Sequence, residues 1–151
     1  MDKILNEEEF ERYLHNQIPI TKEMEFWIEN FEANDVKIGA SLDANINHKG
    51  TAFGGSISSL MTICGWAIVF NNIKRIDPDA HIVVHTGAIK YMRPVENDFV
   101  AECHLADKDK MEKFIKTYKR YKKARISLQV FIANNNGDIL AKFQGEYVAF
   151  K

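Results

Sequence analysis

Residues 55–73 constrain the fold more than any other part of the sequence. They form one predicted helix of about five turns, and its side chains are apolar on nearly every side. Ser58, Ser59 and Thr62 supply most of its polar surface. A helix that is apolar all round must be covered on all sides. The rest of the chain therefore has to wrap around this segment.

Alternating apolar and polar side chains predict that the cover is a β-sheet. Residues 25–32 and 36–43 alternate on either side of a turn, which indicates a β-hairpin. Four further strands are predicted at residues 83–92, 99–105, 126–132 and 139–147, with a possible bulge at Gly87 and a hairpin turn at residues 135–138. The predicted fold class is α+β: a curved antiparallel sheet of five or six strands around a long central helix.

Two shorter helices complete the predicted pattern. Asn6 followed by Glu9 resembles a capping box, and Pro19 ends the helix that this box begins. Residues 111–121 place apolar side chains at helical spacing, which indicates an amphipathic helix. The length of 151 residues suits a single domain spanning residues 1–151.

Composition excludes several classes of function. The formal net charge is -1, from 20 basic and 21 acidic residues, so no bulk attraction to nucleic acid is expected. Cys64 and Cys103 lie in apolar runs and indicate no disulfide framework. The acidic N-terminus lacks the apolar core of a signal peptide, and the longest unbroken apolar run is far short of the ~20 residues of a membrane span. We expect a cytoplasmic protein without a membrane partner.

A polar, glycine-rich loop at residues 45–56 leads directly into the long helix. The start of a helix carries unpaired backbone N–H groups and a partial positive charge. Glycines at that point allow a ligand to approach the backbone closely. Such a loop is suited either to a phosphate or to a carbonyl oxygen that becomes an oxyanion.

Several blocks of sequence together resemble one known family. They are Asn45-x-Asn47-His48-x-Gly50-Thr51-Ala52-Phe53-Gly54-Gly55-Ser56, and the shorter pieces Ile18-Pro19-Ile20, Gly65-Trp66, Tyr91-x-Arg93-Pro94-Val95, Ala124-Arg125-Ile126 and Gly145-x-Tyr147-Val148. Over residues 14–150 the chain resembles the hot-dog fold thioesterase superfamily, in particular the bacterial thioesterase-like domains also found fused behind acetyltransferase domains. The resemblance implies a homodimer, in some cases a dimer of dimers, with two acyl-thioester sites at the interface between subunits.

The resemblance also implies roles for the loop. Gly54, Gly55 and Ser56 would form the oxyanion site, in which the backbone N–H groups of Gly55 and Ser56 hold the thioester carbonyl and Gly54 contacts the substrate. Asn45 and Asn47 would position a water molecule, although asparagines in such a loop also often cap its backbone. Many relatives carry a carboxylate on the first turns of the helix, where this chain has Thr62, and no Asp or Glu occurs between Ser56 and Arg75.

The remaining candidates are substrate contacts. Thr51 and Phe53 belong to the same loop as His48, which is either a general base or a solvated side chain. The acyl chain is expected to pass Leu60 and Met61. Lys122, Lys123 and Arg125 end a basic run; they either grip the phosphates of coenzyme A or of a phosphopantetheine arm, or form a solvated helix face.

Other reactive side chains suggest no separate site. Cys64 has only apolar neighbours in sequence and is expected in the core. His81 and His85 lie about 13 Å apart on an extended strand, too far to share a metal ion. No metal site is predicted.

Two functional hypotheses remain open. The first is a thioesterase that hydrolyses an acyl-CoA or acyl-carrier-protein thioester without a metal or redox cofactor, because a thioester is already an activated acyl group. The second is a non-catalytic acyl-thioester binding module, which the missing helix carboxylate motivates. A dehydratase of the same fold ranks last, since it also needs a carboxylate or histidine on the helix.

Overall fold

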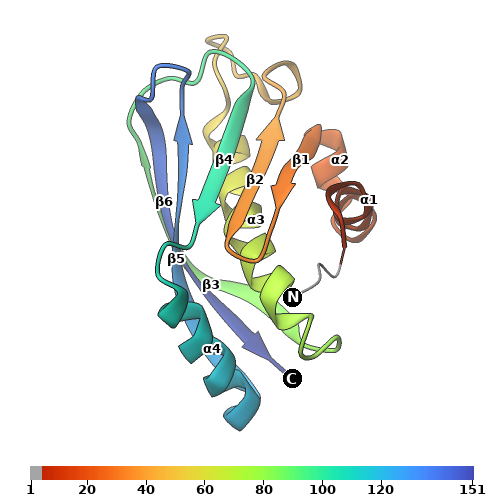
Figure 1. Cartoon of the computed structure of the whole chain (residues 1–151). Helices are drawn as coiled ribbons and strands as arrows, with labels where there is room; N and C mark the ends of the chain where they lie inside the picture. Colours follow the sequence, from red (N-terminus) through yellow and green to blue (C-terminus); the bar gives the residue numbers. More distant parts are fainter. Residues whose placement is uncertain (1–4) are drawn as a thin grey trace.

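The computed structural model describes residues 5–151 as a six-stranded antiparallel sheet curved around one long helix (Figure 1). In space the strands follow the order β1-β2-β4-β5-β6-β3. Their bounds are β1 Phe26–Phe31, β2 Asp35–Ala40, β3 His81–Tyr91, β4 Phe99–His104, β5 Lys123–Ala133 and β6 Ile139–Phe150. The helices are α1 Glu7–Gln17, α2 Ile20–Glu23, α3 Gly54–Ile73 and α4 Lys108–Tyr121. The α+β class and the sheet around a central helix are confirmed.

Helix α3 forms the centre of the molecule. Leu60, Met61 and Cys64 have no exposed surface, and each large apolar side chain buried in this way contributes about 1.5–3 kcal/mol to folding. Gly65 admits the Tyr147 ring, whose hydroxyl oxygen lies 2.3 Å from the position that a Cβ would take. By length and composition alone α3 could cross a membrane, but 67% of its most apolar window is buried inside the molecule, as in a core helix.

Local signals in the sequence placed most elements correctly. The capping box is present, since Asn6 Oδ1 accepts from the N–H of Glu9 and the Glu9 carboxylate accepts from the N–H of Asn6. The predicted bulge at Gly87 was wrong. The pairing of β3 with β6 shifts between Val84 and Thr86 instead. Gly87 is needed for packing, because its Cβ would lie 2.8 Å from the ring of Phe143.

The two edges of the sheet differ. Helix α1 lies along the β1 edge (Figure 1) and satisfies its backbone: Glu11 Oε1 accepts from the N–H of Ile28 at 2.9 Å, Glu7 Oε1 accepts from that of Phe31 at 3.2 Å, and His15 Nε2 lies 2.9 Å from the carbonyl oxygen of Phe26. The other edge is β3. It pairs only with β6, and most of its 11 residues are exposed. Among the described residues, α1 covers one edge and no element covers the other.

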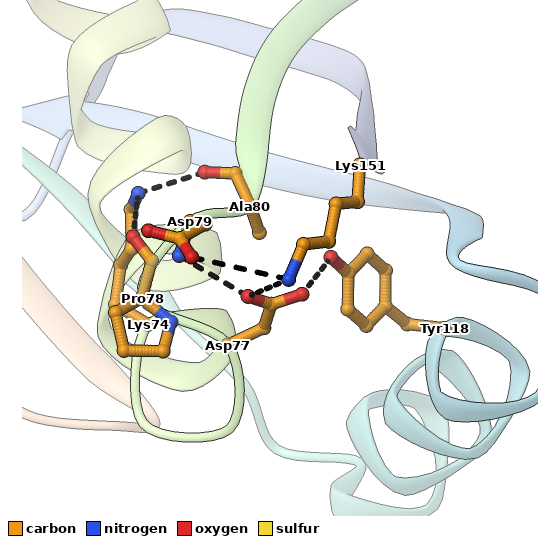
Figure 2. A network of polar contacts seen from close by, with 7 residues as sticks. All are labelled: Lys74, Asp77, Pro78, Asp79, Ala80, Tyr118 and Lys151. Carbon is orange, nitrogen blue, oxygen red and sulfur yellow. Dashed lines mark hydrogen bonds and ion pairs between the residues drawn. The ribbon is translucent and has the colours of Figure 1, made fainter.

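A buried polar network fastens α4 and the C-terminus to the loop after α3 (Figure 2). The Tyr118 hydroxyl donates to Asp77 Oδ2 at 2.7 Å, and the Lys151 ammonium lies 3.3 Å from Asp77 Oδ1. The hydrogen bond from Tyr118 lowers the pKa of Asp77. Burial, followed by the contact with Asp77, raises the pKa of Tyr118 to about 12. At neutral pH, Asp77 therefore stays ionised and the Tyr118 hydroxyl stays protonated.

Candidate active site at the start of the central helix

The loop before α3 is held in shape by its own side chains. Asn47 Oδ1 accepts from the N–H groups of Lys49 and Thr51, and Asn47 Nδ2 donates to Thr51 Oγ1 at 3.0 Å. Gly50 takes a positive φ of 80°, which closes the turn. The Asn47 amide is thus fully engaged in capping the loop. Of the two interpretations of this residue, the geometry favours the structural one.

Asn45 links the loop to the body of the domain. Asn45 is buried, and its Nδ2 donates to the backbone carbonyls of Met24 and Ser41 at 2.8 and 2.7 Å. Its backbone carbonyl accepts from the N–H of Phe53. Its Oδ1 is buried without a hydrogen-bond partner in the described part of the chain. A buried unpaired acceptor is costly. The Asn45 side chain therefore anchors the loop, and its Oδ1 is enclosed by the protein.

The first turn of α3 presents two backbone donors. Ser56 and Ile57 both donate their N–H groups to the carbonyl of Phe53, at 3.0 and 3.1 Å. Among residues 5–151 no side chain caps the helix, so the N–H groups of Gly54 and Gly55 are the donors left unpaired within this part of the chain. The sequence predicted Gly55 and Ser56; the structure moves the pair one residue toward the N-terminus, because the Ser56 N–H is already used.

Two exposed aromatic rings flank these glycines. A Cβ on Gly55 would meet the ring of Phe53 at 2.4 Å, and a Cβ on Gly54 would meet the ring of Tyr91 at 3.6 Å. The Tyr91 hydroxyl donates to the carbonyl of Gly54 at 3.1 Å. Tyr91 belongs to one of the sequence blocks that resemble the family, but it was not predicted as a site residue. Its position beside the helix start depends on how β3 packs, and no local sequence signal could have revealed it.

A pocket of about 310 Å³ opens beside the helix start. It is lined by Thr51, Ala52, Gly54, Ile57, Tyr91, Met92, Arg93, Pro94 and Val95. Thr51 and Gly54 were predicted site residues, whereas Tyr91 and Arg93 were missed. The lining contains no carboxylate and no imidazole. His48 is exposed at the tip of the turn and lies outside this pocket.

The polar side of α3 extends away from the helix start. Thr62 is half-buried, and its hydroxyl donates to the carbonyl of Ser58 at 2.8 Å. Ser59 donates to the carbonyl of Gly55 in the same way. Each hydroxyl oxygen thus keeps its lone pairs for a water molecule. Leu60 and Met61 face the sheet with no exposed surface, so the expectation that they line an acyl path is not met in the structure of one subunit.

A second hollow of about 530 Å³ gathers the other predicted contacts. Lys122, Lys123 and Arg125 all line it, far along the sheet from the helix start. Cys64 belongs to neither hollow. Burial raises the pKa of its thiol, and its Sγ lies 3.5 Å from the carbonyl oxygens of Val36 and Ala101, as expected for a packed core residue.

Comparisons with known proteins give the family and the fold of the chain. A family model described as "Putative thioesterase (yiiD_Cterm)" matches residues 7–151. A solved protein of unknown function from Chlorobaculum tepidum TLS is 29% identical to this chain, with a TM-score of 0.89 over 97% of this chain and 98% of that one. A "putative thioesterase" from Shewanella oneidensis is 26% identical, with a TM-score of 0.80 over 96% and 97%.

A more distant neighbour shows the same fold. It is a protein of unknown function from Pseudomonas aeruginosa, described as a "Probable Thioesterase", with 21% identity and a TM-score of 0.81 over 95% of both chains.

Proposed function

The chain belongs to the family described as "Putative thioesterase (yiiD_Cterm)" and has a hot-dog fold, and on that basis we propose that it hydrolyses the thioester of an acyl-CoA or of an acyl carrier protein. One observation carries the proposal. Two unpaired backbone N–H groups, those of Gly54 and Gly55, begin the central helix beside an open pocket. They are suited to hold the thioester oxygen as it becomes an oxyanion.

Hydrolysis of a thioester requires few further groups from the protein. The oxygen of a water molecule forms a bond to the carbonyl carbon, and the electron pair of the C=O π bond moves onto the oxygen held by the N–H groups of Gly54 and Gly55. The attacking water loses a proton to solvent. The C=O bond then re-forms, the C–S bond breaks, and the products are a carboxylic acid and a thiolate. Free thiols have a pKa of about 8.5, so the leaving group departs without strong acid assistance. Thr62 Oγ1, on the half-buried side of α3, is an acceptor suited to orient the water. We propose no metal or redox cofactor.

The active form is proposed to be a homodimer paired through β3. This strand leaves a full row of backbone groups unpaired on one side, whereas the opposite edge of the sheet is covered by α1. A two-fold axis through the middle of β3 would join two copies into one antiparallel sheet of twelve strands. A second subunit would also cover the half-exposed side of α3.

The direct test is turnover. Purified protein is mixed with short, medium, long and aromatic acyl-CoAs, and with acylated carrier proteins, and the released thiol is measured. We expect saturable hydrolysis of at least one class. A folded protein that releases no thiol above background from any of them would contradict the proposal.

A non-catalytic binding module is the second candidate. It is favoured by the absence of any Asp or Glu on α3 and by the lack of a carboxylate in the lining of the pocket. It predicts that calorimetry detects acyl-CoA binding while the thioester stays intact for hours. Hydrolysis that follows the bound fraction would exclude it.

A further inference from the structure

A hollow of about 300 Å³ lies over β3, β6 and β5, on the face of the sheet turned away from α3. We call it the outer hollow. Its lining includes Ala88, Lys90, Gln129, Phe131, Lys142 and Gln144. None of these residues was predicted as a site residue, and none lines the pocket at the helix start. Lys90 directly precedes Tyr91 of that pocket, so the two side chains point to opposite faces of β3.

The register of the three strands brings these side chains together. Lys142 of β6 lies opposite Lys90 of β3 on one side and Phe131 of β5 on the other. Two residues further along β6, Gln144 lies opposite Gln129. Residues directly opposite one another share a face of the sheet. Lys142 and Gln144 are exposed and alternate with buried residues of β6, so the shared face is the outer one.

Two ammonium groups meet in the outer hollow without a counter-ion. Directly opposite residues have Cβ atoms about 5 Å apart, and like charges in such positions destabilise a sheet. Neither Lys90 nor Lys142 forms an ion pair with any residue between 5 and 151. The floor beside them is low, because the residue opposite Gln144 on β3 is Ala88. The lysine pair therefore borders open space.

The acidic residues beside the outer hollow do not supply the missing charge. Glu102, opposite Phe131, lies 3.9 Å from the ammonium of Lys37. Glu146, further along β6, lies 3.9 Å from the guanidinium of Arg125. Each of these carboxylates is thus turned to a different cation. An anion that approaches from solution would balance the lysine pair, and phosphate is an anion that lysine commonly binds.

The rest of the lining indicates what the phosphate is attached to. Gln129 and Gln144 are exposed, and each side-chain amide offers two donors and one acceptor, which suits hydroxyl groups. Phe131 is half-buried and adds apolar surface to the same hollow. A few polar groups that fix orientation beside an apolar wall are typical of a small-molecule site. Hydroxyl groups next to an apolar C–H surface are the features of a sugar.

We propose that the outer hollow binds a sugar phosphate. Lys90 and Lys142 hold the phosphate, Gln129 and Gln144 bind sugar hydroxyls, and Phe131 packs against the C–H face of the ring. A phosphate monoester carries a charge of about −1.5 to −2 at pH 7 and three strong acceptor oxygens, which matches two ammonium groups. The site lies on the other face of β3 from the side chain of Tyr91, and the inference does not depend on the proposed hydrolysis.

The first experiment measures binding and locates it. The isotope-labelled full chain is titrated at constant ionic strength with glucose 6-phosphate, inorganic phosphate and glucose, and the backbone amides are followed by NMR. We expect glucose 6-phosphate to bind at least about threefold more tightly than inorganic phosphate, because the ring adds contacts to those of the phosphate. The shifts should centre on residues 88–90, 129–131 and 142–144. Equal affinity for glucose 6-phosphate and either control ligand, shifts centred elsewhere, or no binding would overturn the inference.

Charge variants test the lysine pair. Lys90→Gln and Lys142→Gln are each expected to weaken glucose 6-phosphate binding about tenfold, the usual effect of removing a charged partner. Loss of either charge relieves the like-charge contact, so the melting temperature without ligand should hold or rise. Lys123→Gln is the matched control, since Lys123 is an exposed lysine of the second hollow. An equal loss of affinity in Lys123→Gln would place the phosphate in that hollow and overturn the inference.

Phe131→Leu tests the sugar half of the site. The variant keeps both ammonium groups and reduces the apolar surface beside them. It should weaken glucose 6-phosphate binding about threefold and leave the affinity for inorganic phosphate unchanged. Unchanged affinity for glucose 6-phosphate, or an equal loss for both ligands, would contradict the assignment of a sugar to the outer hollow.

Discussion

At the scale of single residues, the most specific proposal is that the backbone N–H of Gly54 is an oxyanion donor. Substitution by proline removes this N–H. Gly54 is the first residue of α3, where proline is well tolerated because its missing N–H breaks no helical bond. Phe53 already has the extended backbone, with ψ 134°, that precedes proline. Gly54→Pro is expected to lower kcat about 10²–10³-fold, the usual effect of losing one oxyanion donor.

Gly54→Ala is the matched control for this change. A Cβ there meets only the Tyr91 ring, at an ordinary contact distance of 3.6 Å, and the N–H is kept. We expect near-normal kcat from the alanine variant, with circular dichroism showing that both variants are folded. If alanine and proline reduce kcat equally, the loss comes from steric change and the Gly54 N–H is not an oxyanion donor.

Asp77 predicts a pH dependence of stability. Its pKa is lowered in the folded protein, first by the hydrogen bond from Tyr118. A lowered pKa stabilises the fold above the unfolded pKa of about 3.9, and this stabilisation is lost as the pH falls through the folded value. Asp77→Asn should therefore melt at a lower temperature at neutral pH and lose less stability in acid than the wild type.

Thermal unfolding between pH 7 and pH 2.5 checks this. Asp79→Asn is the control, since the Asp79 side chain is largely exposed and lies 3.9 Å from Lys151. The control should follow the wild-type curve. Parallel curves for the wild type and Asp77→Asn would show that the network in Figure 2 does not contribute to acid sensitivity.

Sequence reasoning succeeded at this scale only where the determinants are local. The Asn6–Glu9 box is encoded within four residues, and it is present in the structure. The identity of the unpaired donors was predicted one residue too late, because it depends on which carbonyl the Ser56 N–H reaches. Tyr91, at the end of β3, and Lys151, just after β6, reach their sites from distant parts of the chain, so no local pattern could reveal these contacts.

At the scale of elements, α1 acts as a cover for one strand. The Glu11 carboxylate accepts the Ile28 N–H at 2.9 Å, on the side of β1 that has no neighbouring strand. Glu11→Ala should destabilise the protein by about 1 kcal/mol through loss of this bond and expose the β1 edge. We expect a lower urea midpoint and faster aggregation on heating.

Glu11→Gln provides the comparison, because its amide oxygen can still accept from the Ile28 N–H. It should retain most of the stability lost in Glu11→Ala. If both variants unfold at the wild-type urea concentration, the contact between α1 and β1 carries no net stabilisation.

The helices and strands themselves were predictable, because apolar residues recur along them with a clear period. Alternation located all six strands, and the apolar segment located α3. The bulge near His85 was misplaced, since a shift in register depends on how two strands pair and not on either strand alone. The short helix α2 was not predicted, because four residues carry too little periodic signal.

At the scale of the whole molecule, the open β3 edge predicts a dimer. Thr86 is exposed at the middle of this edge and would lie beside its counterpart at the two-fold axis, so Thr86→Lys would bring two ammonium groups close together at a paired interface. Sedimentation velocity should give a mass twice 17.4 kDa for the wild type and a smaller mass for the variant. Ile20→Lys, at an exposed residue on α2, should leave the dimer intact. A monomeric wild type at tens of micromolar would refute the pairing.

The covering of β1 by α1 also sets an upper limit on growth by edge pairing. A sheet with two free edges can add copies at both ends without limit and so form fibres. A sheet with one free edge can pair with only one further copy. Once two copies meet through β3, no strand edge remains to recruit a third, and any larger assembly has to form through faces of the sheet or through helices. Helix α1 therefore limits edge-to-edge assembly of sheets, in addition to packing against the core.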